Sequence, residues 1–282
     1  MDYLNQNITK IIEIETMDME TPAGLSFKDP FSMPLSDRRS SDRRSSERRK
    51  TETSHFRKIT IVIPALNEEH AIGSVIKEVP IEQLKKMGYS VEIMVIDNGS
   101  VDKTRHIANS HGAKVIVQPI KGYGNAYKAG FANATGDIIA TGDADLTYPF
   151  NDLPKIIKKI EDENLDFITT DRLTNLEPGV MSRTHYFGNL LLQFITKTLY
   201  GLSCKDSQSG MWIFKSSIWS KLNVKSLGMP FSQELKIEAY KNGFRCAEVP
   251  IIYRARIGEV KLSTLKDGVG NMLHLIKKRI LG

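Results

Sequence analysis

The segment Asp137-Ile-Ile-Ala-Thr-Gly-Asp143-Ala-Asp145 sets the expectation for the fold. Its apolar run, residues 138–141, is typical of a buried strand, and two carboxylates one residue apart follow where that strand ends. Open α/β sheets bind ligands beyond the carboxyl ends of their strands. Carboxylate oxygens suit Mg²⁺ or Mn²⁺ shared with a substrate diphosphate. An isolated Asp-x-Asp pair is more often two solvated loop aspartates than a metal site. Here the position after a strand and the neighbouring motifs favour the metal site.

Short β-rich runs alternate with helical stretches around this segment. The expected strands are residues 59–63, 91–96, 114–117, 138–141 and 167–170. The expected helices lie near residues 68–79, 102–111, 124–134 and 152–163. This alternation predicts an α/β fold with a mostly parallel central sheet flanked by helices.

The first part of the chain differs in composition from the rest. Residues 36–50 are three charged pentads, Ser-Asp-Arg-Arg-Ser twice and then Ser-Glu-Arg-Arg-Lys, and they carry +4 of the net charge of +6. Low-complexity charged sequence buries too little apolar area to offset its ordering entropy. We therefore expect residues 1–55 to form a disordered basic tail. Such a tail is either a handle for an anionic surface, membrane or nucleic acid, or a solvated tail.

The remaining bulk properties narrow the class of protein. The chain has 282 residues, enough for one large or two modest domains. Cys204 and Cys246 provide neither a disulfide framework nor metal-ligand spacing, which fits a reducing compartment. The N-terminus lacks a signal-peptide core. No stretch reaches the roughly 18 apolar residues of a membrane-spanning helix.

Polar residues and glycines cluster after the predicted strands. Asp97 ends a largely apolar strand, where it can accept a hydrogen bond from a ring N–H of uracil or guanine, or cap the next helix. Gly122 and Gly124 are expected to let the backbone approach a ligand closely, with Lys121 supplying charge toward phosphate. This segment lacks the third glycine of a dinucleotide-binding motif and follows the third strand rather than the first.

Together these loops resemble those of the family 2 glycosyltransferases with a GT-A fold, in particular the dolichyl- and polyprenyl-phosphate glycosyltransferases. The resemblance covers about residues 57–265. It implies a site for a nucleotide-sugar in which Asp97 holds the base, and in which Asp143 and Asp145 bind Mg²⁺ or Mn²⁺. The residues implied to line the nucleotide-sugar site are Pro64, Ala65, Asn67, Glu68, Asp97, Lys121, Gly122, Asp143 and Ala144.

The second half of the chain carries further motifs of this subgroup. Residues 206–210, Asp-Ser-Gln-Ser-Gly, are similar to its Asp-x-x-Ser-Gly segment, and residues 231–235 to its acidic motif. Residues 253–262 resemble its Arg-x-Gly-x-Ser-Lys-Leu signature. Arginines bind diphosphate and phosphate groups bidentately. The residues implied to bind phosphate or acceptor are Arg172, Arg183, Ser209, Arg256 and Lys261.

Three positions depart from the family pattern. Leu66 stands where the family often has a tyrosine, and Val260 replaces the signature serine. Thr147 occupies the place of a glutamine that commonly adds a metal ligand. These changes leave the reaction class intact and leave the donor open.

The resemblance implies an inverting, metal-dependent transfer of a sugar from a UDP- or GDP-linked donor to dolichyl or polyprenyl phosphate at the cytoplasmic membrane face. Asp145, Glu234 and Arg256 are the expected catalytic residues. Glu234 is a candidate base if the acceptor is a hydroxyl, and an organising residue if it is a phosphate; a helix N-terminal charge is the third reading. The alternative function is a soluble family 2 glycosyltransferase acting on a glycan or a small hydroxylated acceptor.

Two amphipathic stretches complete the expected organisation. Apolar residues recur at helical spacing in residues 186–200 and 262–280, and lysines and Arg279 surround the second stretch. Such helices lie on an anionic membrane surface, or pack on the core or on a second subunit of a homo-oligomer. We expect a glycosyltransferase domain over residues 56–258 and an amphipathic C-terminal helix over residues 259–282. The expected location is cytoplasmic and peripheral to the membrane, with no nucleic-acid partner.

Overall fold

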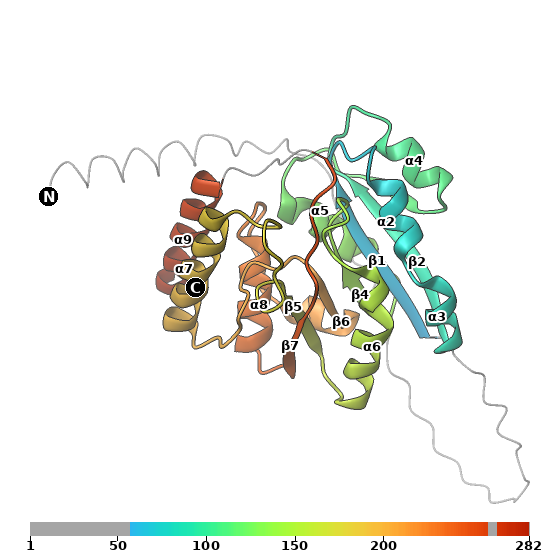
Figure 1. The fold of residues 1–282 in the computed structure, drawn as a ribbon. Helices are drawn as coiled ribbons and strands as arrows, with labels where there is room; N and C mark the ends of the chain where they lie inside the picture. Colours follow the sequence, from blue (N-terminus) through green and yellow to red (C-terminus); the bar gives the residue numbers. More distant parts are fainter. Residues whose placement is uncertain (1–56, 259–263, 282) are drawn as a thin grey trace, which may run out of the picture. The chain divides into compact units, whose positions relative to one another are not determined.

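The structure, a computed structural model, describes residues 57–258 and 264–281 (Figure 1). The expected basic tail lies outside these residues, as do Val260 and Lys261. The strands are β1 Arg57–Ala65, β2 Tyr89–Asp97, β3 Lys114–Val117, β4 Ile138–Thr141, β5 Phe167–Asp171, β6 Trp212–Lys215 and β7 Cys246–Pro250. The helices are α2 Ile72–Glu78, α3 Ile81–Lys86, α4 Thr104–Ser110, α5 Tyr123–Asn133, α6 Leu153–Asp162, α7 Arg183–Tyr200, α8 Phe231–Lys241 and α9 Thr264–Leu281, with 3₁₀ helices η1 Phe150–Asp152 and η2 Ser216–Lys221.

The strands form one seven-stranded sheet in the order β3-β2-β1-β4-β6-β5-β7. All neighbouring strands are parallel except at β6, which runs antiparallel to β4 and β5. This confirms the expectation of a mostly parallel sheet. The chain reaches β3 at one edge and then crosses to β4 on the other side of β1. Ligands bind at such a switch point, outside the carboxyl ends of the strands.

Helices cover both faces of the sheet. One apolar cluster joins the sheet to α2, α3, α4 and α6, and a second joins it to α5 and α8. Successive side chains of a strand point to opposite faces, and β1 follows this rule: Ile61 and Ile63 lie in the first cluster and Val62 in the second. Because both faces are covered, the central strands are almost wholly apolar.

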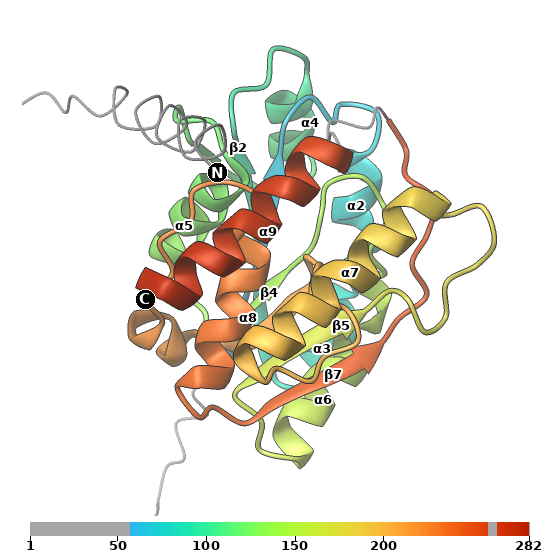
Figure 2. The same ribbon diagram turned by 90° about the vertical axis from the view of Figure 1, so that its left-hand side faces the viewer.

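Helices α7 and α9 lie side by side and pack on α8 (Figure 2). Leu192, Ile237 and Leu275 form their shared apolar contact, and Tyr200 Oη donates a hydrogen bond to the Leu275 carbonyl at 2.6 Å. The expected amphipathic C-terminal helix is therefore present as α9. Among the described residues, none of the helices has the length and apolar character needed to cross a bilayer.

Candidate active site

The loop after β4 carries the Asp-x-Asp pair. The Thr147 backbone N–H and hydroxyl donate hydrogen bonds to Asp145 Oδ1, at 3.1 and 2.6 Å. Leu146 between them adopts a positive φ of 68°, which turns the loop back onto the aspartate. Thr147 thus fixes one oxygen of Asp145 and leaves the other, Oδ2, facing Arg256.

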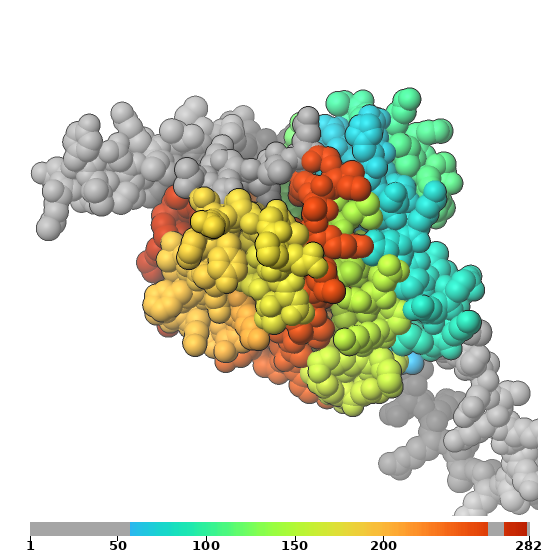
Figure 3. Space-filling view, in the orientation of Figure 1, coloured from blue at the N-terminus to red at the C-terminus, as the bar shows by residue number. Residues whose placement is uncertain are grey.

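The segment that follows β7 brings Arg256 to this loop. Arg254 N donates to the Thr147 carbonyl and Ile257 N donates to the Asp145 carbonyl, both at 3.0 Å. The two chain segments therefore run alongside each other. As a result, Arg256 Nη2 lies 2.7 Å from Asp145 Oδ2. In the space-filling view this segment is the orange-red band that crosses the surface beside the green and yellow parts (Figure 3).

The carboxylate pair has the properties of a cation site. Desolvation, and after it the negative charge of Asp145, raises the pKa of Asp143 to about 7. Asp145 Oδ2 is buried and, apart from its ion pair with Arg256, receives no hydrogen bond from the described residues. Asp143 and Asp145 thus offer hard oxygen ligands whose negative charge the neighbouring residues only partly balance. Such a pair fits Mg²⁺ or Mn²⁺, which take further ligands from water and phosphate. Within residues 57–258 and 264–281 no cluster of three or more His, Cys, Asp or Glu side chains suits a metal.

Asp97 lies buried at the carboxyl end of β2. Its Oδ1 accepts a hydrogen bond from Ser100 N at 3.2 Å, and its Oδ2 is paired with Arg105 Nε at 2.8 Å. In the turn that leads into α4, Asp102 Oδ1 accepts from Thr104 N at 3.0 Å, while the N-cap position is Lys103, whose side chain forms no capping hydrogen bond. Asp97 therefore bonds within the loop before α4 and to Arg105, and it does not cap that helix.

The loop after β1 is joined to this region by hydrogen bonds. Asn67 Oδ1 accepts from Val101 N at 2.9 Å, and Glu68 N donates to Thr104 Oγ1 at 2.8 Å. Pro64 and Ala65 form the last pairs of β1 with β2. The predicted nucleoside-binding residues of β1 and β2 are thus brought together at one edge of the sheet.

The glycines after β3 lie against another part of the backbone. A Cβ at Gly122 would lie 2.5 Å from the Leu227 carbonyl oxygen, and one at Gly124 would lie 2.6 Å from the Ser226 carbonyl oxygen. These glycines therefore admit the chain's own backbone, and the approach of a ligand to Gly122 stays a prediction. Lys121 is exposed beside Gly99, so its predicted approach to a phosphate stays a prediction.

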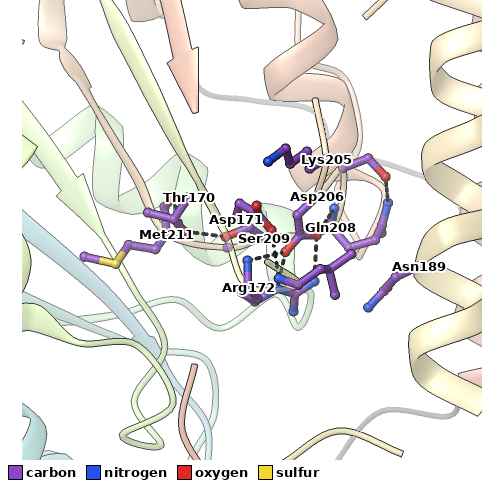
Figure 4. A network of polar contacts seen from close by, with 12 residues as sticks. Thr170, Asp171, Arg172, Asn189, Lys205, Asp206, Gln208, Ser209 and Met211 are labelled. Atoms are coloured by element: carbon purple, nitrogen blue, oxygen red, sulfur yellow. Dashed lines mark hydrogen bonds and ion pairs between the residues drawn. The ribbon is translucent and has the colours of Figure 1, made fainter. Parts of the chain in front are cut away.

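Arg172 forms a buried ion pair rather than an open anion site (Figure 4). Its Nε and Nη2 donate to the two oxygens of Asp206 at 2.6 and 3.0 Å, and its guanidinium lies over the Tyr253 ring. Ser209, from the same motif as Asp206, shares a 2.6 Å hydrogen bond with Thr170. These contacts brace the loop that follows β5, and phosphate binding by Arg172 and Ser209 stays a prediction.

The other predicted residues lie in three different settings. Arg183 is exposed at the first position of α7, and Ala144 is buried in the main apolar cluster. Lys261 lies outside the described residues. The contribution of Ala144 to the nucleotide-sugar site therefore stays a prediction.

Glu234 is held on both sides by other parts of the chain. Its Oε2 accepts from the backbone N–H groups of Lys225 and Ser226 at 3.1 and 2.7 Å, and its Oε1 accepts from Lys278 Nζ at 2.9 Å. Burial alone would raise its pKa, but the hydrogen bonds from Ser226 and Lys278 hold that pKa below its usual value. This environment fits an organising residue and is unfavourable for a general base.

Sequence reasoning missed His185, which lies in the first turn of α7. Burial, and then the positive charges of Arg172 and Arg256, lower the pKa of His185. This shift in pKa favours the neutral form of the imidazole. Its position in the motif-free stretch after Arg183 gave no signal in the sequence.

Comparison with known proteins agrees with this geometry. Residues 60–222 match the family described as Glycosyl transferase family 2. The low-salt glycan biosynthesis hexosyltransferase Agl6 of Haloferax volcanii is 38% identical over 212 residues, which are 74% of this chain and 51% of Agl6. The dolichyl-phosphate hexose transferase of the same organism is 32% identical over 223 residues, covering 79% of this chain and 94% of that protein.

A solved structure shows the same fold. Glucosyl-3-phosphoglycerate synthase from Mycobacterium tuberculosis, in complex with Mn²⁺, UDP and glucosyl-3-phosphoglycerate, superposes with a TM-score of 0.60. The two proteins are 24% identical, and the match covers 79% of this chain and 80% of the synthase. The sheet described above is therefore a GT-A fold, and the chain belongs to the family 2 glycosyltransferases.

Proposed function

We propose that this protein transfers a hexosyl group from a UDP- or GDP-sugar to dolichyl or polyprenyl phosphate, with inversion, at the cytoplasmic face of a membrane. The observation that carries the proposal is the 2.7 Å approach of Arg256 to Asp145. It joins the motif implied to hold a metal to the motif implied to hold a lipid phosphate. A relative that aligns over 94% of its own length is named a dolichyl-phosphate hexose transferase, which supports this acceptor.

Asp143 and Asp145 are the residues that would hold Mg²⁺ or Mn²⁺. When bound, the ion supplies positive charge that stabilises the departing nucleoside diphosphate. Arg256 adds a fixed positive charge at the same place, where it can bind phosphate oxygens bidentately.

The state of Glu234 favours a phosphate acceptor over a hydroxyl. A hydroxyl nucleophile needs a base, yet both oxygens of Glu234 accept hydrogen bonds from Lys278 and from two backbone N–H groups. A phosphate monoester is already anionic near neutral pH. One of its oxygens attacks the anomeric carbon, and the bond from that carbon to the diphosphate breaks, with the electron pair leaving on the diphosphate. No proton has to be removed.

The outward sides of α7 and α9 support a peripheral association with the membrane. Phe187, Leu191 and Phe194 on α7 form one exposed apolar stripe, and Val269, Leu273, Ile276 and Ile280 on α9 form another. Each stripe lies opposite the side that its helix buries against α8. Helix α7 contains no acidic residue, and exposed Lys197, Lys277 and Arg279 flank the stripes. Apolar stripes edged by cations suit anionic headgroups.

The test is transfer of labelled sugar from UDP- and GDP-sugars into organic-extractable dolichyl phosphate, with Mn²⁺ or Mg²⁺. We expect labelled lipid from the full-length protein, and a loss of about hundredfold or more in Asp145→Ala. Asp162→Ala, which removes an exposed carboxylate of α6, is the matched control. Labelling of a soluble acceptor, with none in the lipid, would replace the proposed function with the alternative acceptor class.

A further inference from the structure

A buried lysine joins helix α9 to α8. Lys278 Nζ lies 2.9 Å from Glu234 Oε1 and 2.8 Å from Glu238 Oε1. The exposed fractions of the three side chains are 9%, 1% and 8%, so the contact is shielded from solvent. One ammonium is thus shared by two buried carboxylates, and a substitution that removes it takes the positive charge from both.

The same carboxylate holds the backbone of residues 225–227, which we call the 225–227 loop. Glu234 Oε2 accepts hydrogen bonds from Lys225 N and Ser226 N at 3.1 and 2.7 Å. Helix α9 also meets this loop directly, since Ser226 Oγ lies 3.1 Å from His274 Nε2. The position of the loop therefore depends on side chains of α8 and α9.

The 225–227 loop lies against the beginning of α5. Asn125 N donates to the Leu227 carbonyl at 3.1 Å. A Cβ at Gly122 would lie 2.5 Å from the oxygen of that carbonyl. Since glycine carries no side chain, the two backbones are in direct contact. A shift of the 225–227 loop therefore moves Gly122, because packed interiors transmit strain.

Gly122 directly follows Lys121, the residue predicted to reach the diphosphate. Gly122 N donates to Asn98 Oδ1 at 2.8 Å, and Asn98 follows Asp97, the residue implied to hold the base. The Lys121 side chain lies beside the same turn, since a Cβ at Gly99 would be 3.5 Å from Lys121 Cε. Gly122 thus connects the start of α5 to the residues predicted to bind the two ends of the nucleoside diphosphate.

From this series of contacts we infer that Lys278 is a positioning residue for the donor. It holds Glu234 and the 225–227 loop in the arrangement that places Lys121 where the diphosphate binds. Lys278 acts through the loop, since its own ammonium is buried and paired with two carboxylates. The inference rests on the proposed function for its nucleotide-sugar donor, and it is independent of the acceptor.

Calorimetric titration of the full-length protein with UDP or GDP, in the presence of Mn²⁺, tests the inference without acceptor or membrane. We expect Lys278→Met to lower the affinity about tenfold, because Glu234 loses the cation that holds it against the 225–227 loop. Lys277→Met is the matched control, since Lys277 is the exposed neighbour on the same helix, and its affinity should equal that of the wild type. An unchanged affinity in Lys278→Met would overturn the inference.

A double variant distinguishes positioning from a general loss of stability. If Lys278 acts by placing Lys121, then Lys121→Met alone should lower the affinity about tenfold, and Lys278→Met should add little in its presence. If Lys278→Met only loosens the fold, the two losses should multiply to about hundredfold. Multiplied losses would overturn the inference, and so would an unchanged affinity in Lys121→Met.

Lys128→Met keeps the inference testable if Lys278→Met does not fold. Lys128 of α5 donates from Nζ to the Lys225 carbonyl at 2.9 Å, so it holds the same loop from another helix. This hydrogen bond is exposed, and we expect its loss to leave the protein folded and to lower the affinity about threefold. Equal affinities of Lys128→Met and the wild type would contradict the role given to the 225–227 loop.

Two results separate this inference from the proposed function. Failure of the wild type to bind either UDP or GDP would overturn both. Binding of UDP or GDP, together with transfer of the sugar to a soluble acceptor, would overturn the lipid acceptor only. The affinities of the lysine variants would then still decide the role of Lys278.

Discussion

The carboxylate of Asp97 is fully buried, and its partner Arg105 has a side chain that is 47% exposed. Turning Arg105 toward solvent would break its pair with this buried carboxylate and its 2.9 Å hydrogen bond to the Ser100 carbonyl, so it requires a ligand group that compensates the Asp97 charge. The Asp97 oxygen that Arg105 now holds then becomes available to a ring N–H. A ring N–H of a nucleobase would then donate to Asp97 Oδ2 in place of Arg105 Nε. The hydrogen bond from Ser100 N to Asp97 Oδ1 already holds the carboxylate in place.

Asp97→Asn is therefore expected to weaken the binding of UDP or GDP about tenfold, because an amide has one acceptor where the carboxylate has two. Calorimetric titration of the full-length protein measures the affinity. Weaker binding could come from lost recognition of the base or from loss of the Asp97–Arg105 ion pair. Arg105→Leu distinguishes the two, since it removes the ion pair and keeps the carboxylate. A loss of the same size in Arg105→Leu would mean that the ion pair, rather than base recognition, is responsible.

Among the helices, α5 and α7 offer a matched pair of glycines. A methyl group at Gly124 would press on the backbone of Ser226, whose N–H holds Glu234, whereas a methyl group at Gly188 meets nothing within 4 Å. We expect Gly124→Ala to lower the free energy of unfolding by about 1–3 kcal/mol. Gly188→Ala should raise it by about 0.5–1 kcal/mol. Urea unfolding measures both, and equal effects would contradict the predicted contact.

Asp166, which precedes β5, ties together the starts of β5 and β7 and the end of β6. Its carboxylate accepts from Arg245 Nε and backbone N–H before β7, at 3.0 and 3.1 Å, and from Lys215 Nζ of β6 at 2.9 Å. Hydrogen bonds from Arg245 outweigh burial and hold the pKa of Asp166 well below its usual value.

The pKa shift of Asp166 predicts a pH dependence. A pKa below the unfolded value of about 3.9 means that the unfolded chain binds the proton more readily. The stabilisation is complete above about pH 5 and is lost as the pH falls below about 4. Asp166→Asn should cost about 1 kcal/mol at pH 7, since Arg245 is half-exposed, and less at pH 3. A difference between wild type and variant that stays constant from pH 7 to 3 would exclude this pair as the cause.

The elements also show what the sequence could predict. The first five strands were found from their apolar and β-branched runs, which in β1, β2 and β4 reflect burial on both faces of the sheet. The antiparallel β6 was missed as a sheet member, since the run Trp212–Lys215 carries no information about its neighbours β4 and β5. The glycines after β3 were recognised as a close approach, but only the fold shows that residues 226 and 227 are what approach them.

In the candidate active site too, the local sequence predicted the residues, whereas only the fold shows their partners. Asp97, Asp143, Asp145 and Arg256 were identified from motifs, and the structure places each at the carboxyl edge of the sheet or against it. The partners of Arg172 and Glu234 were not predicted, because Asp206 and Lys278 lie 34 and 44 residues away in the chain. Residue type shows that a charge is present, whereas the fold decides what neutralises it.

At the scale of the whole molecule, the stripes of α7 and α9 predict binding to vesicles. We expect the double variant Phe194→Glu, Leu273→Glu to lose at least about tenfold in binding to vesicles of phosphatidylcholine with anionic phosphatidylserine. Sedimentation with vesicles that contain no dolichyl phosphate measures binding apart from activity. Val101→Glu is the control, because Val101 is 91% exposed but lies outside these helices. If Val101→Glu lost as much vesicle binding as the double variant, the membrane-binding surface could not be confined to α7 and α9.

The contacts of residues 251–281 bear on when the enzyme becomes active during its synthesis. Arg256 reaches back to Asp145, and Lys278 reaches back to Glu234. When the ribosome has synthesised the chain only through β7, Arg256 and Lys278 have not yet been added. At that stage Asp145 and Glu234 lack the positively charged side chains that pair with them in the complete fold. The mature arrangement forms only when the last helix of the described chain has emerged. A translation product truncated after β7 would therefore hold the aspartates of the site and lack both residues that complete it.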